Sequence, residues 1–143
     1  MSDMKEACLE ALEMGQSYST INVVSDEDIV KFSEVTGDVN PIHLDEDYAK
    51  KSIFGERIAH GMISAGYISA IFGTKFPGPG SIYLSQSLKF RAPVKIGDSV
   101  ETTVTIVELN EKRKRVTLNC ECKVGDTVVL TGEAQLMVPS EKG

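Results

Sequence analysis

Alternating apolar and polar residues in the second half of the chain restrict the fold more than any other feature of the sequence. From Arg115 to Val124 the alternation is unbroken, with apolar residues at even positions and polar or charged residues at odd ones. That period is typical of a strand with one buried face. Val100–Ile106 alternates in the same way, Ile82–Phe90 has strand composition, and Thr127–Val138 follows the tight turn Gly125-Asp126. Four consecutive strands predict an antiparallel sheet, and in the last one we expect a core face of Val128, Leu130, Ala134, Leu136 and Val138.

A stretch without any charged side chain precedes these strands. Ile58–Thr74 contains seventeen uncharged residues, which is at the short limit for a membrane span. Its histidine, glycines and serines favour instead a helix over Ile58–Gly73 that is buried inside a globular protein. One long helix and a sheet with one face to cover predict an α+β fold. Because no face of this helix carries a charge, we expect a second copy of the chain to cover its other side, in a homodimer.

The first half of the chain contains three further predicted elements. A strand is expected over Tyr18–Val24. Ser25 is a good N-cap for a helix with three acids in its first turn and its end at Gly37. Between this helix and the uncharged one, the chain is irregular and polar except for a short helix around Asp45–Lys51. Phe76–Gly80, with two prolines and two glycines, is a loop.

Length and composition limit the class of protein. The 143 residues fit one globular domain, so we expect an N-terminal arm or short helix over residues 1–14 and a single domain over residues 15–143. A net charge of −6 and a pI near 4.9 disfavour binding to nucleic acid or to an anionic membrane. The three cysteines do not form a disulfide framework, and the first residues lack the pattern of a secretory signal. A cytoplasmic location is therefore expected.

Asp38 and His43 are the strongest candidates for chemistry. In the run from Gly37 to His43, Pro41 fixes its own φ and holds Asn40 extended. A stiff turn of this kind can direct a carboxylate and an imidazole at one point, where they would act on a water molecule as an acid–base pair. The alternative is a structural turn in which Asp38 caps backbone N–H groups. The residues alone leave both interpretations open.

His60-Gly61 and a basic run are weaker candidates. The first N–H groups of a helix lack intrahelical partners and lie at the positive end of its dipole, and Gly61 would let a ligand oxygen approach them. Equally, Gly61 relieves crowding between helix and sheet and His60 packs at the helix start. Lys112–Arg115 at a hairpin tip is either a solvated turn or a contact for the phosphates of a nucleotide-bearing ligand.

Metal and covalent chemistry have little support. An EF-hand loop starting at Asp38 would need an acid or amide in place of Ile42 and a glycine in place of His43. Cys120 and Cys122 lie on the apolar face of a predicted strand and are interpreted as core thiols. The sequence contains no nucleophile elbow, phosphate-binding loop or dinucleotide fingerprint. We therefore expect neither a metal nor a cofactor.

One motif of the chain consists of Phe32, the run Val35-Thr36-Gly37-Asp38-Val39-Asn40-Pro41-Ile42-His43, and Ala49. This motif resembles the hydratase motif of the MaoC-like, R-specific enoyl-CoA hydratases of the hot-dog superfamily. The similarity covers the chain from about Gly15 onward. It continues through Ile58–Met62, Ser81–Leu84, Phe90–Val94 and Gly97-Asp98.

The resemblance implies a long helix wrapped by an antiparallel sheet, in a homodimer. It implies reversible, R-specific hydration of trans-2-enoyl-CoA to (R)-3-hydroxyacyl-CoA, with coenzyme A present only as part of the substrate. Asp38 and His43 fall on the catalytic positions. Gly61, Ser69 and Asn40 fall on positions that bind the substrate, and Gly61 is the one whose N–H polarises the thioester carbonyl.

Three other functions remain open. The same chemistry could act on 3-hydroxyacyl groups of acyl carrier protein. The chain could hydrolyse acyl-CoA thioesters, as other hot-dog proteins do, although the paired Asp38 and His43 argue against it. It could also bind acyl groups without turnover.

Overall fold

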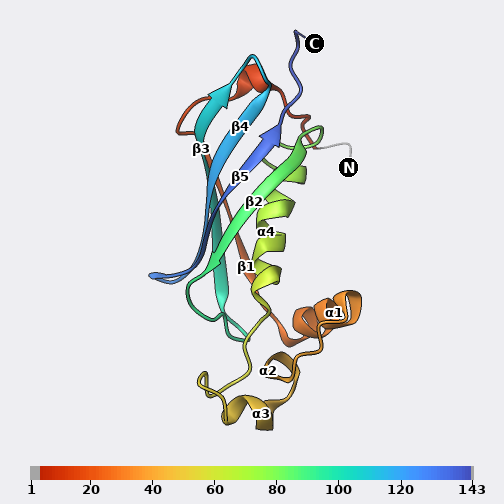
Figure 1. The fold of residues 1–143 in the computed structure, drawn as a ribbon, viewed down its shortest axis with the longest axis vertical. Coiled ribbons are helices and arrows are strands. Elements are labelled where there is room, and N and C mark those ends of the chain that lie inside the picture. Colours follow the sequence, from red (N-terminus) through yellow and green to blue (C-terminus); the bar gives the residue numbers. More distant parts are fainter. Residues whose placement is uncertain (1–3, 143) are drawn as a thin grey trace.

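The computed structural model describes residues 4–142 and contains one antiparallel sheet with a long helix along it (Figure 1). The sheet has five strands in the order β1-β3-β4-β5-β2. The strands are β1 (Ser17–Val23), β2 (Ile82–Phe90), β3 (Ser99–Asn110), β4 (Arg115–Val124) and β5 (Thr127–Met137). The helices are α1 (Asp26–Thr36), α2 (Pro41–Leu44), α3 (Glu46–Lys50) and α4 (Gly61–Thr74), with a 3₁₀ turn at Leu9–Ala11.

The core lies between α4 and the sheet. Ile68, Ile71 and Phe72 of α4 belong to one apolar cluster together with the buried residues of the strands. On β4, the buried residues of this cluster are those that the alternation predicts: Val116, Leu118, Cys120 and Cys122. A helix wrapped by an antiparallel sheet is the α+β, hot-dog arrangement expected from the sequence, and this prediction is confirmed.

The prediction of the core face is wrong at one residue, Val128. On β5, Val129 is buried with 3% of its surface exposed, whereas Val128 is half-buried. The pairing of β4 with β5 shifts between Cys122 and Lys123. An irregularity of this kind moves the alternation by one residue, so the period of two does not hold across it.

The long helix begins three residues later than predicted. Ile58 forms an isolated antiparallel bridge with Lys95, and the Ala59 N–H donates to the Val94 carbonyl over 2.7 Å. The first residues of the uncharged stretch therefore run as an extended segment beside the β2–β3 connection, and α4 starts at Gly61.

The predicted caps of α1 are present. Ser25 accepts a hydrogen bond from the Asp28 N–H, and the Asp28 side chain accepts one from the Ser25 N–H, which forms a capping box. Gly37 ends the helix with a φ of 79°, a left-handed conformation that favours glycine. This cap directs the chain toward α2, which the sequence did not predict, and α3, which it did.

The N-terminal arm packs against distant parts of the chain. Residues 4–14 contain only the short 3₁₀ turn. The Ala7 N–H donates to Pro79 in the loop after α4, and the Leu9 N–H donates to Pro139 after β5. Residues 1–3 of the expected arm and Gly143 of the expected domain lie outside the described residues. Among residues 4–142, no helix combines the length and apolar character that a membrane crossing requires.

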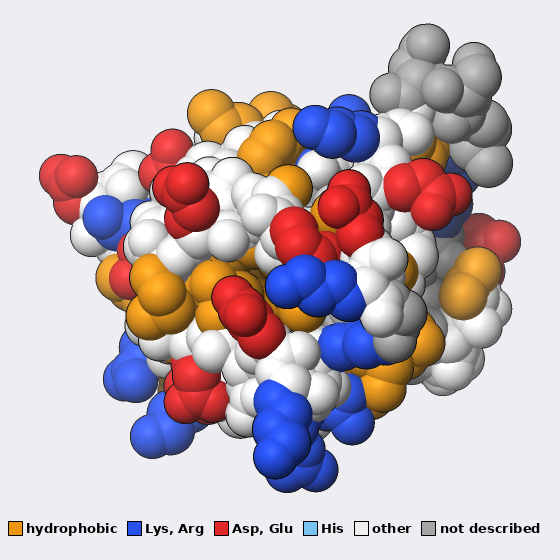
Figure 2. Space-filling view, turned by 90° about the horizontal axis from the view of Figure 1, so that it is seen from above, with side chains coloured by type: hydrophobic (Ala, Val, Ile, Leu, Met, Phe, Trp, Pro, Cys, Tyr) orange, Lys and Arg blue, Asp and Glu red, His pale blue; other side chains and the backbone are white. Residues whose placement is uncertain are grey.

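Two neighbouring surfaces have no covering element within the described residues. β2 is an edge strand paired only with β5, and Ile82 and Leu84 on it are 54% and 41% exposed. On α4, an exposed stripe of mostly small residues recurs at helical spacing: Met62, Gly66, Ser69, Ala70 and Gly73. By contrast, Figure 2 shows acidic, basic and apolar side chains mixed over the end of the molecule that carries both termini.

Candidate active site

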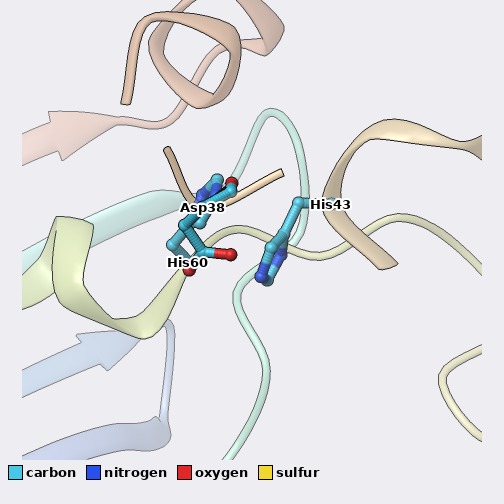
Figure 3. Close-up of side chains that lie close together, drawn as sticks. All are labelled: Asp38, His43 and His60. Atoms are coloured by element: carbon cyan, nitrogen blue, oxygen red, sulfur yellow. Dashed lines mark hydrogen bonds between the residues drawn. The ribbon is translucent and has the colours of Figure 1, made fainter. Parts of the chain in front are cut away.

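Three side chains meet at the N-terminal end of α4. Asp38 follows α1, His43 lies in α2, and His60 immediately precedes α4 (Figure 3). One carboxylate oxygen of Asp38 and one ring nitrogen of each histidine lie within 4.8 Å of one another. Two groups at that separation are close enough to hydrogen-bond to one bridging water.

The end of α1 orients Asp38. The Thr36 hydroxyl donates to the Phe32 carbonyl over 2.7 Å and accepts from the Asp38 N–H over 3.1 Å. Among residues 4–142, the Asp38 carboxylate has only a long contact of 3.4 Å with the Asn40 N–H, at the weak limit of hydrogen bonding. Asp38 therefore contributes little as a cap, and its carboxylate is available to a ligand.

Asn40 and Pro41 build the turn between the two candidate catalytic residues. Asn40 is extended, with φ −52° and ψ 125°, and its side-chain oxygen accepts from the Ile42 N–H over 3.1 Å. Pro41 is the first residue of α2, where its missing N–H costs nothing. Asn40 was expected to bind substrate; in this structure its side-chain oxygen caps α2, the helix that carries His43.

His43 is held in one orientation and one tautomer. Its side chain is buried, and Nδ1 lies 2.7 Å from the Ile58 carbonyl oxygen. Because a carbonyl only accepts, Nδ1 carries the proton and Nε2 keeps its lone pair. Burial lowers the pKa of His43 and the nearby His60 adds to this, while the bond to Ile58 and the Asp38 charge act in the opposite direction. The imidazole is thereby favoured as an acceptor.

A largely apolar cavity of about 390 Å³ reaches these groups. Asp38, His43 and Gly61 line it together with Phe90 and Arg91 from the end of β2 and the residue after it. Such a cavity, with few polar groups in an apolar lining, suits a small organic ligand.

Gly61 lies where α4 and β2 come close together, at the edge of the cavity. A Cβ atom at this position would lie 2.5 Å from Cε1 of Phe90, so a larger residue here would displace the Phe90 ring, whereas glycine fits. The N-cap residue His60 makes no side-chain cap bond to α4. The N-cap residue therefore leaves the first N–H groups of α4 without a side-chain cap. These groups lie beside the cavity that Gly61 lines.

Ser69 lies in a second, more open cavity of about 870 Å³. Asp38 and Met62 line both cavities. Tyr83 also lines the second one; burial raises the pKa of its hydroxyl to about 12, and this hydroxyl donates to the Gln86 side chain. At neutral pH Tyr83 therefore acts as a hydrogen-bonding group.

Asp38, His43 and His60 are also residue types that bind transition metals. The two imidazole rings are stacked, however, with centroids 3.8 Å apart and planes 28° apart. Nitrogen lone pairs lie in the ring plane, so stacked rings do not direct two of them at one ion. The arrangement suits acid–base chemistry better than chelation.

The other candidates of the sequence lie away from this site. Lys112–Arg115 forms the turn between β3 and β4, at the end of the sheet opposite to α2 and α3 (Figure 1). Cys120 and Cys122 are buried in the core, and burial raises the pKa of the Cys120 thiol to about 11. Neither cysteine is poised as a nucleophile.

Sequence reasoning missed the contacts of Arg57 and Ile58 with His43, one of the two candidate catalytic residues (Asp38 and His43, the dyad). Arg57 donates from Nε to the His43 carbonyl over 2.7 Å and pairs with Asp26 at the start of α1. Ile58 supplies the carbonyl that holds His43. Backbone acceptors leave no signal in a sequence pattern, and the Arg57 contacts span 14 and 31 residues. In the sequence, this region was marked by His60 beside Gly61 and by the resemblance through Ile58–Met62, neither of which indicates these contacts.

The fold and the site define a class. A hot-dog domain that brings an aspartate and a histidine together beside an apolar cavity at the start of its long helix is built for acid–base chemistry on a small organic ligand. A model of the MaoC like domain matches residues 10–128. The chain belongs to this family.

Similar proteins of known name support that assignment. A 3-hydroxybutyryl-CoA dehydratase of Methylorubrum extorquens is 49% identical over 99% of this chain and 90% of its own length. An (R)-specific enoyl-CoA hydratase of Rhodospirillum rubrum is 51% identical over 92% of this chain and 91% of its own. The solved (R)-hydratase of A. caviae superposes with a TM-score of 0.88 at 36% identity, covering 91% and 99% of the two chains.

Proposed function

We propose that this protein is a hydro-lyase that adds water reversibly and R-specifically to trans-2-enoyl-CoA, giving (R)-3-hydroxyacyl-CoA. The observation that carries the proposal is the separation of at most 4.8 Å between an Asp38 carboxylate oxygen and a His43 ring nitrogen, beside an apolar cavity. Relatives near 50% identity, named as a hydratase and a dehydratase of acyl-CoA thioesters, support it. The R configuration rests on the relatives alone.

In the proposed reaction, one water molecule lies between the dyad and C3 of the substrate. Asp38 takes a proton from this water, and His43 orients it by accepting its second hydrogen at Nε2, the nitrogen that the Ile58 bond leaves free. The oxygen adds to C3 as the C2–C3 double bond opens. The dyad returns one proton to C2 on the same face, so that water is added and no charge accumulates.

The thioester carbonyl draws charge from C3, and the enolate oxygen needs stabilisation in the transition state. We assign this role to the N–H of Gly61, at the uncapped start of α4. One oxyanion donor of this kind typically contributes about 3 to 4 kcal/mol. Ser69 lines the cavity on the other side of Asp38 and is proposed to contact the substrate there. No metal or redox cofactor takes part.

The proposed assembly is a homodimer. The unpaired edge of β2 offers a row of backbone groups to a second chain, and the small-residue stripe of α4 lies next to it, as the second cavity, lined by both elements, indicates. A second copy would cover both surfaces at once. The proposed location is the cytoplasm. The free thiols of Cys8, Cys120 and Cys122 support it, because the cytoplasm is a reducing environment.

A short enoyl-CoA tests the function directly. We expect the absorbance of the conjugated double bond to disappear, the product to be the R enantiomer, and the reverse reaction to regenerate the double bond. The same acyl group on acyl carrier protein is expected to react more slowly. Release of free CoA thiol would instead show a thioesterase, and tight binding without loss of the double bond would show an acyl-binding module.

A further inference from the structure

His60 is a buried residue that the proposed mechanism does not use. Only 3% of its surface is exposed, and although it is the N-cap residue of α4, its side chain makes no bond to that helix. Its polar and ring contacts go instead to Asp38, His43 and two residues of α1, Phe32 and Ser33.

The first contact fixes the main chain at Asp38. Nε2 of His60 lies 3.0 Å from the Asp38 backbone oxygen and 3.1 Å from the Ser33 hydroxyl. Because the backbone oxygen only accepts, Nε2 carries the proton and donates it. Within the described part of the chain, the Asp38 carboxylate itself has only its long contact with the Asn40 N–H. The position of the carboxylate is therefore set largely through the backbone, where His60 acts.

The second contact restrains the ring of His43. The two imidazoles stack with centroids 3.8 Å apart, while the Ile58 carbonyl holds the edge of the His43 ring through Nδ1. A hydrogen bond to one edge lets a ring tilt about that bond, and a second ring against its face opposes the tilt. His60 itself packs against Phe32, with centroids 4.6 Å apart.

The remaining nitrogen of His60 argues against a purely structural role. Nδ1 is buried and has no hydrogen-bond partner among residues 4–142. A buried polar atom without a partner destabilises a fold. An apolar ring would fill the same space without that cost but could not donate to Asp38.

We propose that His60 is a positioning residue of the active site: through Nε2 it anchors the backbone of Asp38, and with its ring it supports His43, so that both reach one water molecule. The role rests on the proposed hydratase function. It adds a third residue to the dyad, one that lines the cavity but acts on the reaction through its two neighbours.

Substitutions that separate donor, ring and packing test this role. His60→Phe keeps a ring against His43 and removes the donor; we expect kcat to fall about 100-fold with KM within about threefold. His60→Gln restores an N–H near the place of Nε2 and should recover at least about tenfold of that loss. Ser33→Ala, the matched control, removes the other partner of Nε2 and should leave kcat within about twofold.

The double variant S33A/H60F separates catalysis from stability. It replaces a buried polar pair by apolar groups, so its melting temperature should stay within about 5 °C of the parent protein while kcat stays as low as in H60F. The proposal is overturned if H60F keeps the parent kcat, if H60Q recovers nothing, or if S33A loses as much activity as H60F.

A crystal structure of H60F gives a readout that does not depend on activity. We expect the Asp38 carboxylate and the His43 ring to move apart or to adopt several conformers. Both residues in unchanged positions would contradict the positioning role even if the parent protein hydrates enoyl-CoA. Failure of the parent protein to hydrate any enoyl thioester would reject the proposed function instead, and the displacement in H60F would still decide the role of His60.

Discussion

In the proposed mechanism, Asp38 and His43 divide the work that the addition of water requires, and their surroundings suit this division. The Asp38 carboxylate makes one long contact, to the Asn40 N–H, among the residues that the structure describes, whereas His43 is buried and bonded at Nδ1. Asp38→Asn removes the proton acceptor and His43→Ala removes the group that orients water. We expect each to lower kcat about 100- to 10,000-fold, measured by loss of the enoyl absorbance, with unchanged circular dichroism. Asp47→Asn, which changes an exposed acid of α3, is the matched control and should keep full activity.

Gly61 allows its two roles to be separated. Gly61→Ala places a methyl group against the Phe90 ring and beside the N–H proposed to bind the thioester oxygen. We expect a loss of kcat/KM of about 100-fold, as for the removal of an oxyanion donor. The double variant Gly61→Ala/Phe90→Ala relieves the collision. If the double variant recovers the parent rate, the glycine serves packing alone and the oxyanion role is wrong.

The pKa of His43 predicts the behaviour of the enzyme in acid. Burial, and after it the neighbouring His60, hold the pKa below the ordinary 6.5, against the opposing effects of Ile58 and Asp38. Because Nε2 must be unprotonated, the decline of kcat/KM in acid should be centred below pH 6.5. An unfolded chain takes up this proton before the folded one, so stability is also lost as the pH falls below 6.5 toward the lower folded value. A decline in kcat/KM centred above pH 6.5 would contradict this prediction.

At the scale of the elements, the side chain of Arg57 connects helix α1 to helix α2. It pairs with Asp26 in the first turn of α1 and donates to the His43 carbonyl, and its side chain is 16% exposed. Arg57→Ala leaves that carbonyl without its charged donor. We expect the free energy of unfolding to fall by about 1 to 3 kcal/mol and kcat to fall with it, as measured by urea titration and steady-state kinetics. Lys31→Ala, which removes an exposed ion pair with Glu27 on the same helix, should change neither by much.

The elements also show how far sequence reasoning reaches. Strand composition predicts β2 to the residue, and alternation predicts β4 to the residue because one face of β4 is buried. It fails at Val128, where a change of register that depends on the neighbouring strand moves the pattern. The motif from Asp38 to His43 leads to the dyad because a proline-stiffened turn is a local structure. The contacts of Arg57, Ile58 and His60 are tertiary, and no periodicity encodes them.

At the scale of the whole molecule, the uncovered surfaces of α4 and β2 predict a dimer. Sedimentation should give twice the chain mass of 15.6 kDa. Leu84→Asp puts a charge on the edge strand β2, beside the exposed stripe of α4, and should shift the equilibrium to monomers. Ile21→Asp makes the same change at a site 67% exposed on β1, the opposite edge of the sheet, and should leave the dimer intact. A parent protein that sediments as a monomer would reject the assembly.

Three of the bonds that hold the proposed reactive pair end on main-chain oxygens: those of Asp38, His43 and Ile58. Every amino acid supplies such an oxygen, so the scaffold of this site is indifferent to which side chain stands at position 58 as long as the backbone keeps its path. Related chains can therefore diverge widely around a preserved reaction centre. A search by sequence motif would then find the reacting groups and overlook most of what keeps them in place.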